Sequence, residues 1–178
     1  MTPAELPPIE EFELQDPAVL GTVTFRGHRL AHVSTRRAFY RDDKGVERER
    51  QRPRWTEMTL YSVVESKYAY VLYIEGLSVL THRIGSSCDK GVAMSVDDLP
   101  QDAEACPECR PDLTAGRVSF EEDRLTLYRD ETVNDVLRDL KASRNKSATA
   151  LSNPAMRLIQ EASALDPAFR SDQRFETL

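Results

Sequence analysis

The sequence predicts an α+β fold in which an antiparallel, β-rich core precedes two C-terminal helices. Residues 55–65 and 68–75 are rich in aromatic and β-branched residues, which favour strands. Apolar residues at helical spacing appear only after residue 130. Three cysteines between residues 88 and 109 add a loop region suited to binding zinc. Strands first and helices last favour α+β over a doubly wound sheet.

The first predicted strand covers residues 22–34, where apolar and polar residues alternate and Arg26-Gly27 indicates a turn or a bulge. Residues 41–54 have almost no apolar side chains, so we interpret them as a solvated loop or the tip of a hairpin. Residues 55–65 and 68–75 are joined by a short polar stretch and predict a β-hairpin.

The strand at residues 68–75 is apolar on both faces, which predicts a central strand covered on both sides. Its tyrosines are typical of core packing, with a stacking platform for bases as the alternative. Gly76 is expected to end it, and residues 78–81 to form a third strand that leads to His82. Two further short strands are predicted at residues 118–120 and 124–128.

Two helices are predicted near the C-terminus. Thr132 is a suitable N-cap for the first, which continues to about residue 143. Ser152 is a suitable N-cap for the second, with Pro154 in its first turn and Asp166-Pro167 at its end.

The predicted organisation is a disordered acidic tail at residues 1–20, a zinc-stabilised β-rich domain at 21–142, and a C-terminal helix and tail at 143–178 that pack on the domain or extend from it. The tail carries five acidic residues and no Lys or Arg. No apolar run is long enough to span a bilayer, and residues 1–17 lack an apolar signal region. We therefore expect a cytoplasmic protein without a membrane partner.

The candidate metal ligands are His82, Cys88, Cys106 and Cys109. Two thiolates separated by two residues can both reach one ion, and four N/S ligands complete the closed tetrahedron of a structural Zn²⁺ site. Iron is the minor alternative for these thiolates. A redox C-x-x-C motif is the main competitor, but such motifs open a helix, whereas Pro111 follows this one almost directly.

The stretch from Tyr70 to Pro111 resembles small Ada-like zinc-binding modules, often appended to bacterial nucleases, in its aromatic strand, His and Cys ligands, and final Cys-Pro-x-Cys. The resemblance implies a metal role for the same four residues but no nuclease activity. It departs from those modules in its longer His–Cys gap and in Ala105, where they place Pro. Residues 22–75 are also similar to uncharacterised actinobacterial proteins called EXLDI, which implies a β-rich core alone.

Basic residues are concentrated in residues 21–54, which hold ten Lys or Arg and four Asp or Glu. Planar guanidinium groups suit phosphate binding, but the interleaved acids and the net negative charge of the chain favour a self-neutralising solvated loop. The candidate nucleic-acid-binding residues are Arg26, Arg29, Arg36, Arg37, Arg48, Arg50, Arg52 and Arg54.

Two histidines four residues apart, His28 and His32, lack the glutamate of H-E-x-x-H and lie in a predicted strand. That spacing along a strand is about 13 Å, too far to share an ion. The sequence also lacks a phosphate-binding Gly-rich loop and a nucleophile elbow, so it identifies no catalytic residue.

The sequence predicts a non-enzymatic, zinc-stabilised binding or regulatory module that acts through protein partners. The first alternative is a nucleic-acid-binding protein that uses residues 26–54. The second is a hydrolase whose site forms only in three dimensions.

Overall fold

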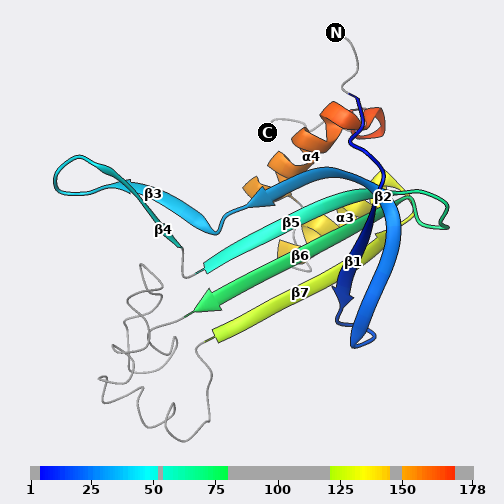
Figure 1. Cartoon of the computed structure of the whole chain (residues 1–178), viewed down its shortest axis with the longest axis horizontal. Helices are drawn as coiled ribbons and strands as arrows, with labels where there is room; N and C mark the ends of the chain where they lie inside the picture. Colours follow the sequence, from blue (N-terminus) through cyan, green and yellow to red (C-terminus); the bar gives the residue numbers. More distant parts are fainter. Residues whose placement is uncertain (1–4, 52–53, 80–120, 145–149, 171–178) are drawn as a thin grey trace, which may run out of the picture. The chain divides into compact units, whose positions relative to one another are not determined.

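The computed structural model describes residues 5–51, 54–79, 121–144 and 150–170 (Figure 1). Among them, five strands form one antiparallel, curled sheet in the order β1-β2-β5-β6-β7. Their bounds are Glu10–Asp16 for β1, Gly21–Ser34 for β2, Arg54–Val63 for β5, Tyr70–Val79 for β6 and Glu121–Asp130 for β7. Two helices follow, α3 at Val133–Arg144 and α4 at Asn153–Leu165, and then the short 3-10 helix η2 at Pro167–Phe169. The predicted α+β class is confirmed.

A separate two-stranded sheet consists of β3 (Arg37–Arg41) and β4 (Glu47–Gln51). The chain divides into two compact units. The first contains residues 1–33, 57–74 and 125–178, and the second contains residues 34–56 and 75–124. The helices and the hydrophobic core belong to the first unit, whereas β3 and β4 belong to the second.

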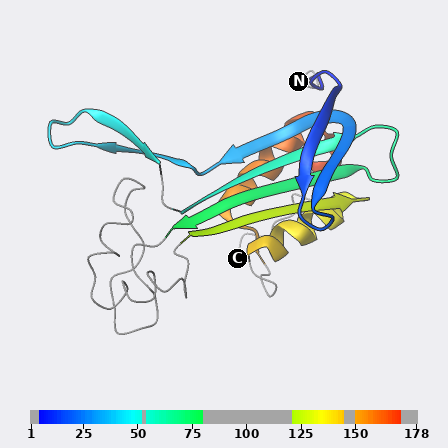
Figure 2. The same cartoon turned by 60° about the horizontal axis from the view of Figure 1, so that its bottom comes forward.

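The hydrophobic core lies between the helices and one face of the sheet, and Figure 2 shows both helices on that side. Alternate residues of β6, Tyr70, Leu72 and Ile74, point into it, as expected from the period of two in a strand. The helices and η2 contribute Val136, Leu140, Ala155, Leu158, Ile159, Ala162 and Phe169. Val71 on the opposite face of β6 is also buried, so the prediction of a central strand covered on both faces is confirmed.

The opposite face of the sheet has its own aromatic cluster. Phe12 and Phe25 are direct partners across β1 and β2, and their ring centroids lie 5.6 Å apart. Tyr61 of β5 completes the cluster, with its centroid 4.6 Å from that of Phe12 and 5.4 Å from that of Phe25. Tilted and edge-on pairs of this kind add to the stability gained from burial alone.

Strand β1 occupies part of the segment for which the sequence predicted a disordered tail. Over Glu10–Asp16, Phe12 and Leu14 are partly buried and Asp16 is buried, while Glu11 and Glu13 are exposed. Glu11 and Glu13 thus lie on the solvent side of an amphipathic edge strand. Charge in an edge strand is compatible with pairing, and it disfavours aggregation through the open edge.

The structure corrects one further strand prediction outright and decides between the alternatives left open at two other places. Gly76 does not end its strand, because β6 continues to Val79, and a Cβ at Gly76 would lie only 3.2 Å from the backbone oxygen of Trp55. No turn interrupts β2 at Arg26-Gly27, where a Cβ on Gly27 would lie 2.0 Å from the Ser62 carbonyl oxygen. That close approach, and not a turn, explains the glycine. The hairpin-tip alternative for residues 41–54 is confirmed by the turn between β3 and β4, although residues 47–51 form β4 and not a loop. The predicted strand at 118–120 lies outside the described residues.

Both predicted helices are confirmed, together with their N-caps. The Thr132 hydroxyl accepts from the Asp135 backbone N–H at 3.2 Å, and the Asp135 carboxylate accepts from the Thr132 backbone N–H at 3.2 Å. This reciprocal arrangement is a capping box. Ser152 accepts from the Ala155 N–H, and α4 ends at Leu165 with Asp166 as its C-cap.

Candidate functional site

One region with a functional prediction is the hairpin surface, which consists of the described side chains of β3, β4 and residues 42–46 between them. The strands pair antiparallel, with Phe39 opposite Glu49 and Arg41 opposite Glu47. Residues that face each other across two strands share one face. Phe39 therefore shares a face with Arg37, Arg41, Glu47 and Glu49.

The turn of the hairpin is built around Asp42. Its carboxylate Oδ1 accepts from the backbone N–H groups of Lys44 and Val46, each at 2.9 Å. Gly45 has a φ of 75°, a conformation that glycine adopts without strain. The other oxygen, Oδ2, accepts from Arg48 Nε at 3.0 Å. The Val46 N–H, followed by Arg48, holds the pKa of Asp42 below its ordinary value.

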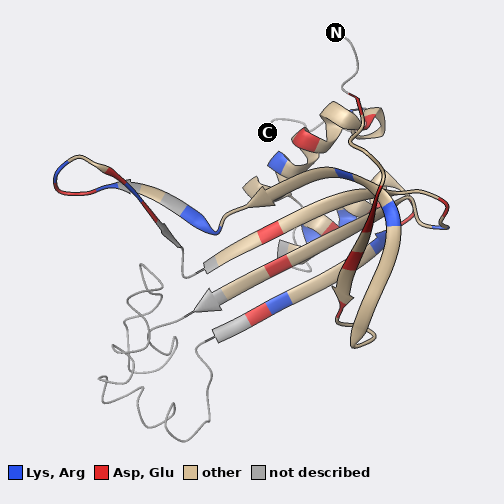
Figure 3. Cartoon of the chain, in the orientation of Figure 1, with Lys and Arg blue, Asp and Glu red and all other residues tan. Residues whose placement is uncertain are grey.

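Two hairpin arginines make ion pairs within the hairpin itself. Arg37 lies 3.0 Å from Glu49, and Arg48 lies 3.0 Å from Asp42. Over residues 37–51 the sequence has five Lys or Arg and four Asp or Glu, so the hairpin is nearly neutral (Figure 3). The excess positive charge of residues 21–54 therefore lies mainly outside the hairpin.

The hairpin surface, although nearly neutral, also has a largely exposed aromatic side chain. Phe39 is 68% exposed, and Val46 in the turn is 48% exposed. Phenylalanine is normally buried, so a largely exposed ring at the centre of a strand is unusual. Aromatic side chains are enriched at protein interfaces, where they supply large contact areas.

The other predicted nucleic-acid-binding arginines have varied surroundings. The guanidinium carbon of Arg36 lies 4.9 Å from the centroid of the Trp55 ring, a cation–π contact. Arg26 is 4.0 Å from Glu65, and Arg29 is exposed on β2. Arg50 lies in β4 and Arg54 in β5, whereas Arg52 lies outside the described residues.

The predicted zinc ligands, His82, Cys88, Cys106 and Cys109, all lie outside the described residues. Within the described ranges, no group of three or more His, Cys, Asp or Glu could hold a metal ion. His28 Nδ1 lies 2.6 Å from the Pro7 carbonyl oxygen, and His32 Nδ1 lies 2.9 Å from the Thr59 hydroxyl. These two histidines thus have separate partners. Among the described helices, none is long and apolar enough to cross a membrane.

A large shift in pKa lies elsewhere, at Asp130, a residue that no sequence motif indicated. This carboxyl group is 2% exposed, and burial, followed by the charge of Asp139, raises its pKa to about 7. Perturbed carboxyl groups often indicate catalytic sites, but one this deeply buried does not meet a substrate. In the sequence, Asp130 appears only as a polar residue two positions before the predicted Thr132 cap, and nothing indicates that it is buried.

The comparisons with known proteins add no family. No family model, curated protein or solved structure matches the chain. The resemblances to Ada-like zinc modules and to EXLDI proteins therefore stay predictions.

Proposed function

We propose that the protein is a non-enzymatic binding module that recognises protein partners through the hairpin surface. The observation that carries this proposal is the exposed Phe39 ring on a hairpin whose charges nearly balance. An interface of this kind combines an apolar anchor with a polar rim.

The ion pairs of the hairpin favour a protein partner over a nucleic acid. Binding to phosphates derives its affinity from cations that are free to neutralise them. Arg37 and Arg48 already contact the carboxylates of Glu49 and Asp42. A nucleic acid would have to displace these acids or approach them, and either process opposes binding.

The test is a quantitative comparison of the proteins retained from a cell extract by the full-length protein and by two variants. Phe39→Ala removes the proposed anchor. Met156→Ala is the matched control, because Met156 is also a large exposed apolar residue, 47% exposed, on α4. We expect a partner that the parent and Met156→Ala retain and that Phe39→Ala retains about tenfold less, as for the loss of one interface anchor. Equal retention by all three would refute the role of the hairpin surface.

Nucleic-acid binding remains a second candidate because of the register of the hairpin. In the register of the two strands, Arg48 is opposite Tyr40 and Arg50 is opposite Ala38, so neither arginine has an acidic residue directly across from it. A salt titration of DNA and RNA binding by the parent and by Arg48→Gln/Arg50→Gln tests this. Phosphate contacts require that log affinity falls linearly with log salt, with a smaller slope in the double variant. Affinity that does not depend on salt excludes this candidate.

We further propose a structural Zn²⁺ ion held by His82, Cys88, Cys106 and Cys109. The support is the donor set, one imidazole and three thiolates, which suits a closed tetrahedral zinc site. These residues lie between β6 and β7, which are neighbours in the sheet. When bound, the ion would cross-link a segment whose two ends are already held by adjacent strands.

Elemental analysis of the purified protein tests the zinc proposal, with one zinc per chain expected. Cys106→Ser should release the metal and lower the melting temperature, because metal-binding free energy is also folding free energy. Ser119→Ala, outside the ligand set, is the control. A metal-free parent, or a Cys106→Ser variant that melts with the parent, would exclude a structural zinc.

A further inference from the structure

Asp130 is the last residue of β7, and its side chain is buried on the helix side of the sheet. Its backbone carbonyl oxygen accepts from the Ala69 N–H at 3.0 Å, which fixes the end of β7 beside the start of β6. The side chain is 2% exposed, and its Oδ2 has no hydrogen-bond partner among the described residues. A buried carboxylate oxygen without a partner is unfavourable, whereas a protonated carboxyl group tolerates burial much better.

The groups that act electrostatically on Asp130 come mainly from α3. Burial raises the pKa of Asp130 most, followed by the charge of Asp139, hydrogen bonding with Asp139 and the charge of Asp135. Two carboxyl groups can be hydrogen-bonded to each other only when at least one holds a proton. On its own strand, Tyr128 has a pKa raised by burial, then by Asp139 and Asp130.

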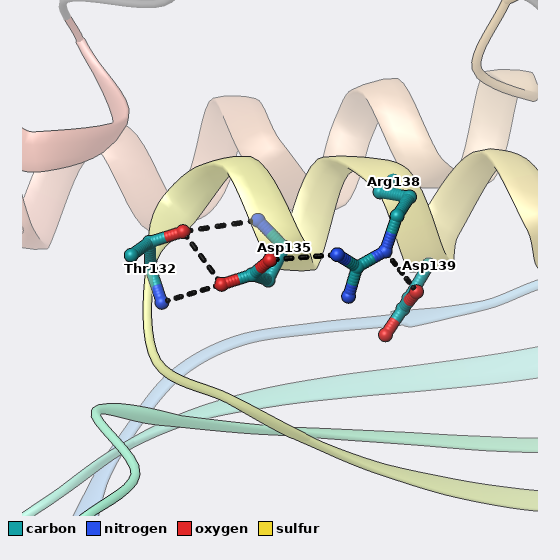
Figure 4. A network of polar contacts seen from close by, with 4 residues as sticks. All are labelled: Thr132, Asp135, Arg138 and Asp139. Atoms are coloured by element: carbon teal, nitrogen blue, oxygen red, sulfur yellow. Dashed lines mark hydrogen bonds and ion pairs between the residues drawn. The ribbon is translucent and has the colours of Figure 1, made fainter.

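The cation that lowers the pKa of Asp130, Arg138, already pairs with two other aspartates. Its Nε donates to Asp139 at 3.0 Å and its NH1 group donates to Asp135 at 2.7 Å (Figure 4). Asp135 in turn accepts from the Thr132 hydroxyl at 2.7 Å. Arg138 is the last and weakest of the influences on Asp130, and it alone among them favours ionisation. The charge of Asp130 thus has little compensation.

We propose that Asp130 and Asp139 form a proton-sensitive contact that holds α3 against the end of β7. When Asp130 is protonated, its hydroxyl donates to the Asp139 carboxylate and links the strand to the helix. When that proton leaves for solvent, two adjacent carboxylates repel, and the contact between β7 and α3 weakens. The contact between Asp130 and Asp139 is therefore formed below neutral pH and weakened above it.

The positions of Asp130 and Asp139 allow the response to pH to be limited to α3. Asp130 precedes the Thr132 cap by two residues, and Asp139 lies two turns into α3. Separating the two carboxylates changes how the first half of α3 meets the sheet, without requiring β7 to leave it. The capping box of Thr132 and Asp135 lies between them and keeps the start of the helix formed.

The test is an NMR pH titration of the full-length protein that follows the side-chain carboxyl carbons and the backbone amides of α3. We expect the Asp130 carboxyl to titrate near neutral pH and the α3 amides to shift with the same midpoint. Asp130→Asn, which stays neutral, should abolish both transitions. Asp123→Asn, an exposed position on the same strand, should leave both unchanged.

Asp139→Asn gives a second test that does not alter the buried residue. Removing the neighbouring negative charge should lower the midpoint of Asp130 by about one pH unit. An Asp130 midpoint in the ordinary range of aspartate, or an α3 transition that persists unchanged in Asp130→Asn, would overturn the proposal.

Discussion

Asp16 and Asp130 are two buried aspartates at the ends of the two edge strands, and their environments are opposite. Asp16 ends β1 and is 1% exposed, while Asp130 ends β7 and is 2% exposed. Arg129 pairs with Asp16 across the curled sheet, from the position immediately before Asp130. Because successive strand residues point to opposite faces, Arg129 lies on one face of the sheet and Asp130, which has no cationic partner among the described residues, lies on the other.

The contrast between these two residues shows that burial alone does not set the charge state of a carboxyl group. The hydrogen bond from Arg129, followed by that from the Ala18 N–H, holds the pKa of Asp16 below its ordinary value. Burial, followed by the charge of Asp139, raises the pKa of Asp130 to about 7. Two side chains of the same chemistry and similar exposure therefore have pKa values shifted in opposite directions, because only Asp16 pairs with a cation within the described part of the chain.

The largest effect is expected when Asp16 loses its cation. Arg129→Met keeps much of the apolar stem but leaves the Asp16 carboxylate buried without a counter-charge. We expect a greater loss of unfolding free energy, measured by urea denaturation at pH 7, than for substitutions of Asp130 or Thr132. The pKa of Asp16 should also rise, because its largest cause of depression is removed.

A double variant separates the pair from the packing around it. Asp16→Asn/Arg129→Met removes both charges and should recover part of the stability lost in Arg129→Met. Arg124→Met, at an exposed position of β7, is the control for substitution of an arginine in this strand. If Arg129→Met is no less stable than Arg124→Met, the ion pair does not stabilise the sheet.

The next largest effect is the pH dependence of stability that Asp130 contributes, which is opposite in sign to that of Asp16. Between an ordinary aspartate pKa of about 3.9 and the folded value of about 7, the folded state binds more protons than the unfolded state. Its contribution to the unfolding free energy therefore falls as pH rises through this window, by on the order of 2–4 kcal/mol, and levels off above it.

Asp130→Asn should remove this slope, so its stability relative to the parent should increase from pH 5 to pH 8. Urea denaturation at several pH values measures it, with Asp123→Asn as the matched control. Asp16, whose pKa is lowered, loses its contribution only in more acidic solution and does not confound this window. A slope that is the same in the parent and in Asp130→Asn would contradict the assignment.

The smallest effect concerns Asp135, a third aspartate, which is partnered by hydrogen bonds near the surface. Thr132→Ala removes the cap of α3 and should cost about 1 kcal/mol of unfolding free energy. The pKa of Asp135 should rise toward its ordinary value, because the Thr132 hydroxyl is the first cause of its depression. Thr132→Ser keeps the hydroxyl and should behave like the parent in both denaturation and NMR titration.

The elements predicted most accurately were those whose signals are local. The caps at Thr132 and Ser152 were predicted from residues within one turn of each helix start. The central strand β6 was predicted from its two apolar faces. Strand β1 was not predicted, because its acidic residues and the prolines around it obscured the alternation of apolar and polar residues. Its pairing with β2 supplies the stability that the segment lacks alone.

For the candidate sites too, local spacing could be interpreted from the sequence, whereas contacts that depend on the fold could not. The spacing of His82, Cys88, Cys106 and Cys109 predicts a zinc site from the sequence alone, and that prediction concerns residues outside the described ranges. The acidic residues interleaved with the arginines of 21–54 indicated a self-neutralising loop, but the sequence did not show which acids pair with Arg37 and Arg48. Pairing depends on the strand register, which charge counts do not contain.

The fold class, the two helices with their caps and the central hairpin of the sheet could be predicted from the sequence, since each depends on propensity and periodicity over a few residues. Which aspartate pairs with a cation could not be predicted, because it depends on the folded arrangement of the strands. Asp16 and Arg129 are 113 residues apart in the chain and meet because the sheet curls. Asp130 lacks a cation because it lies on the other face, against the aspartates of α3. Electrostatic energy depends on distances in space and on burial, and neither follows from separation along the chain.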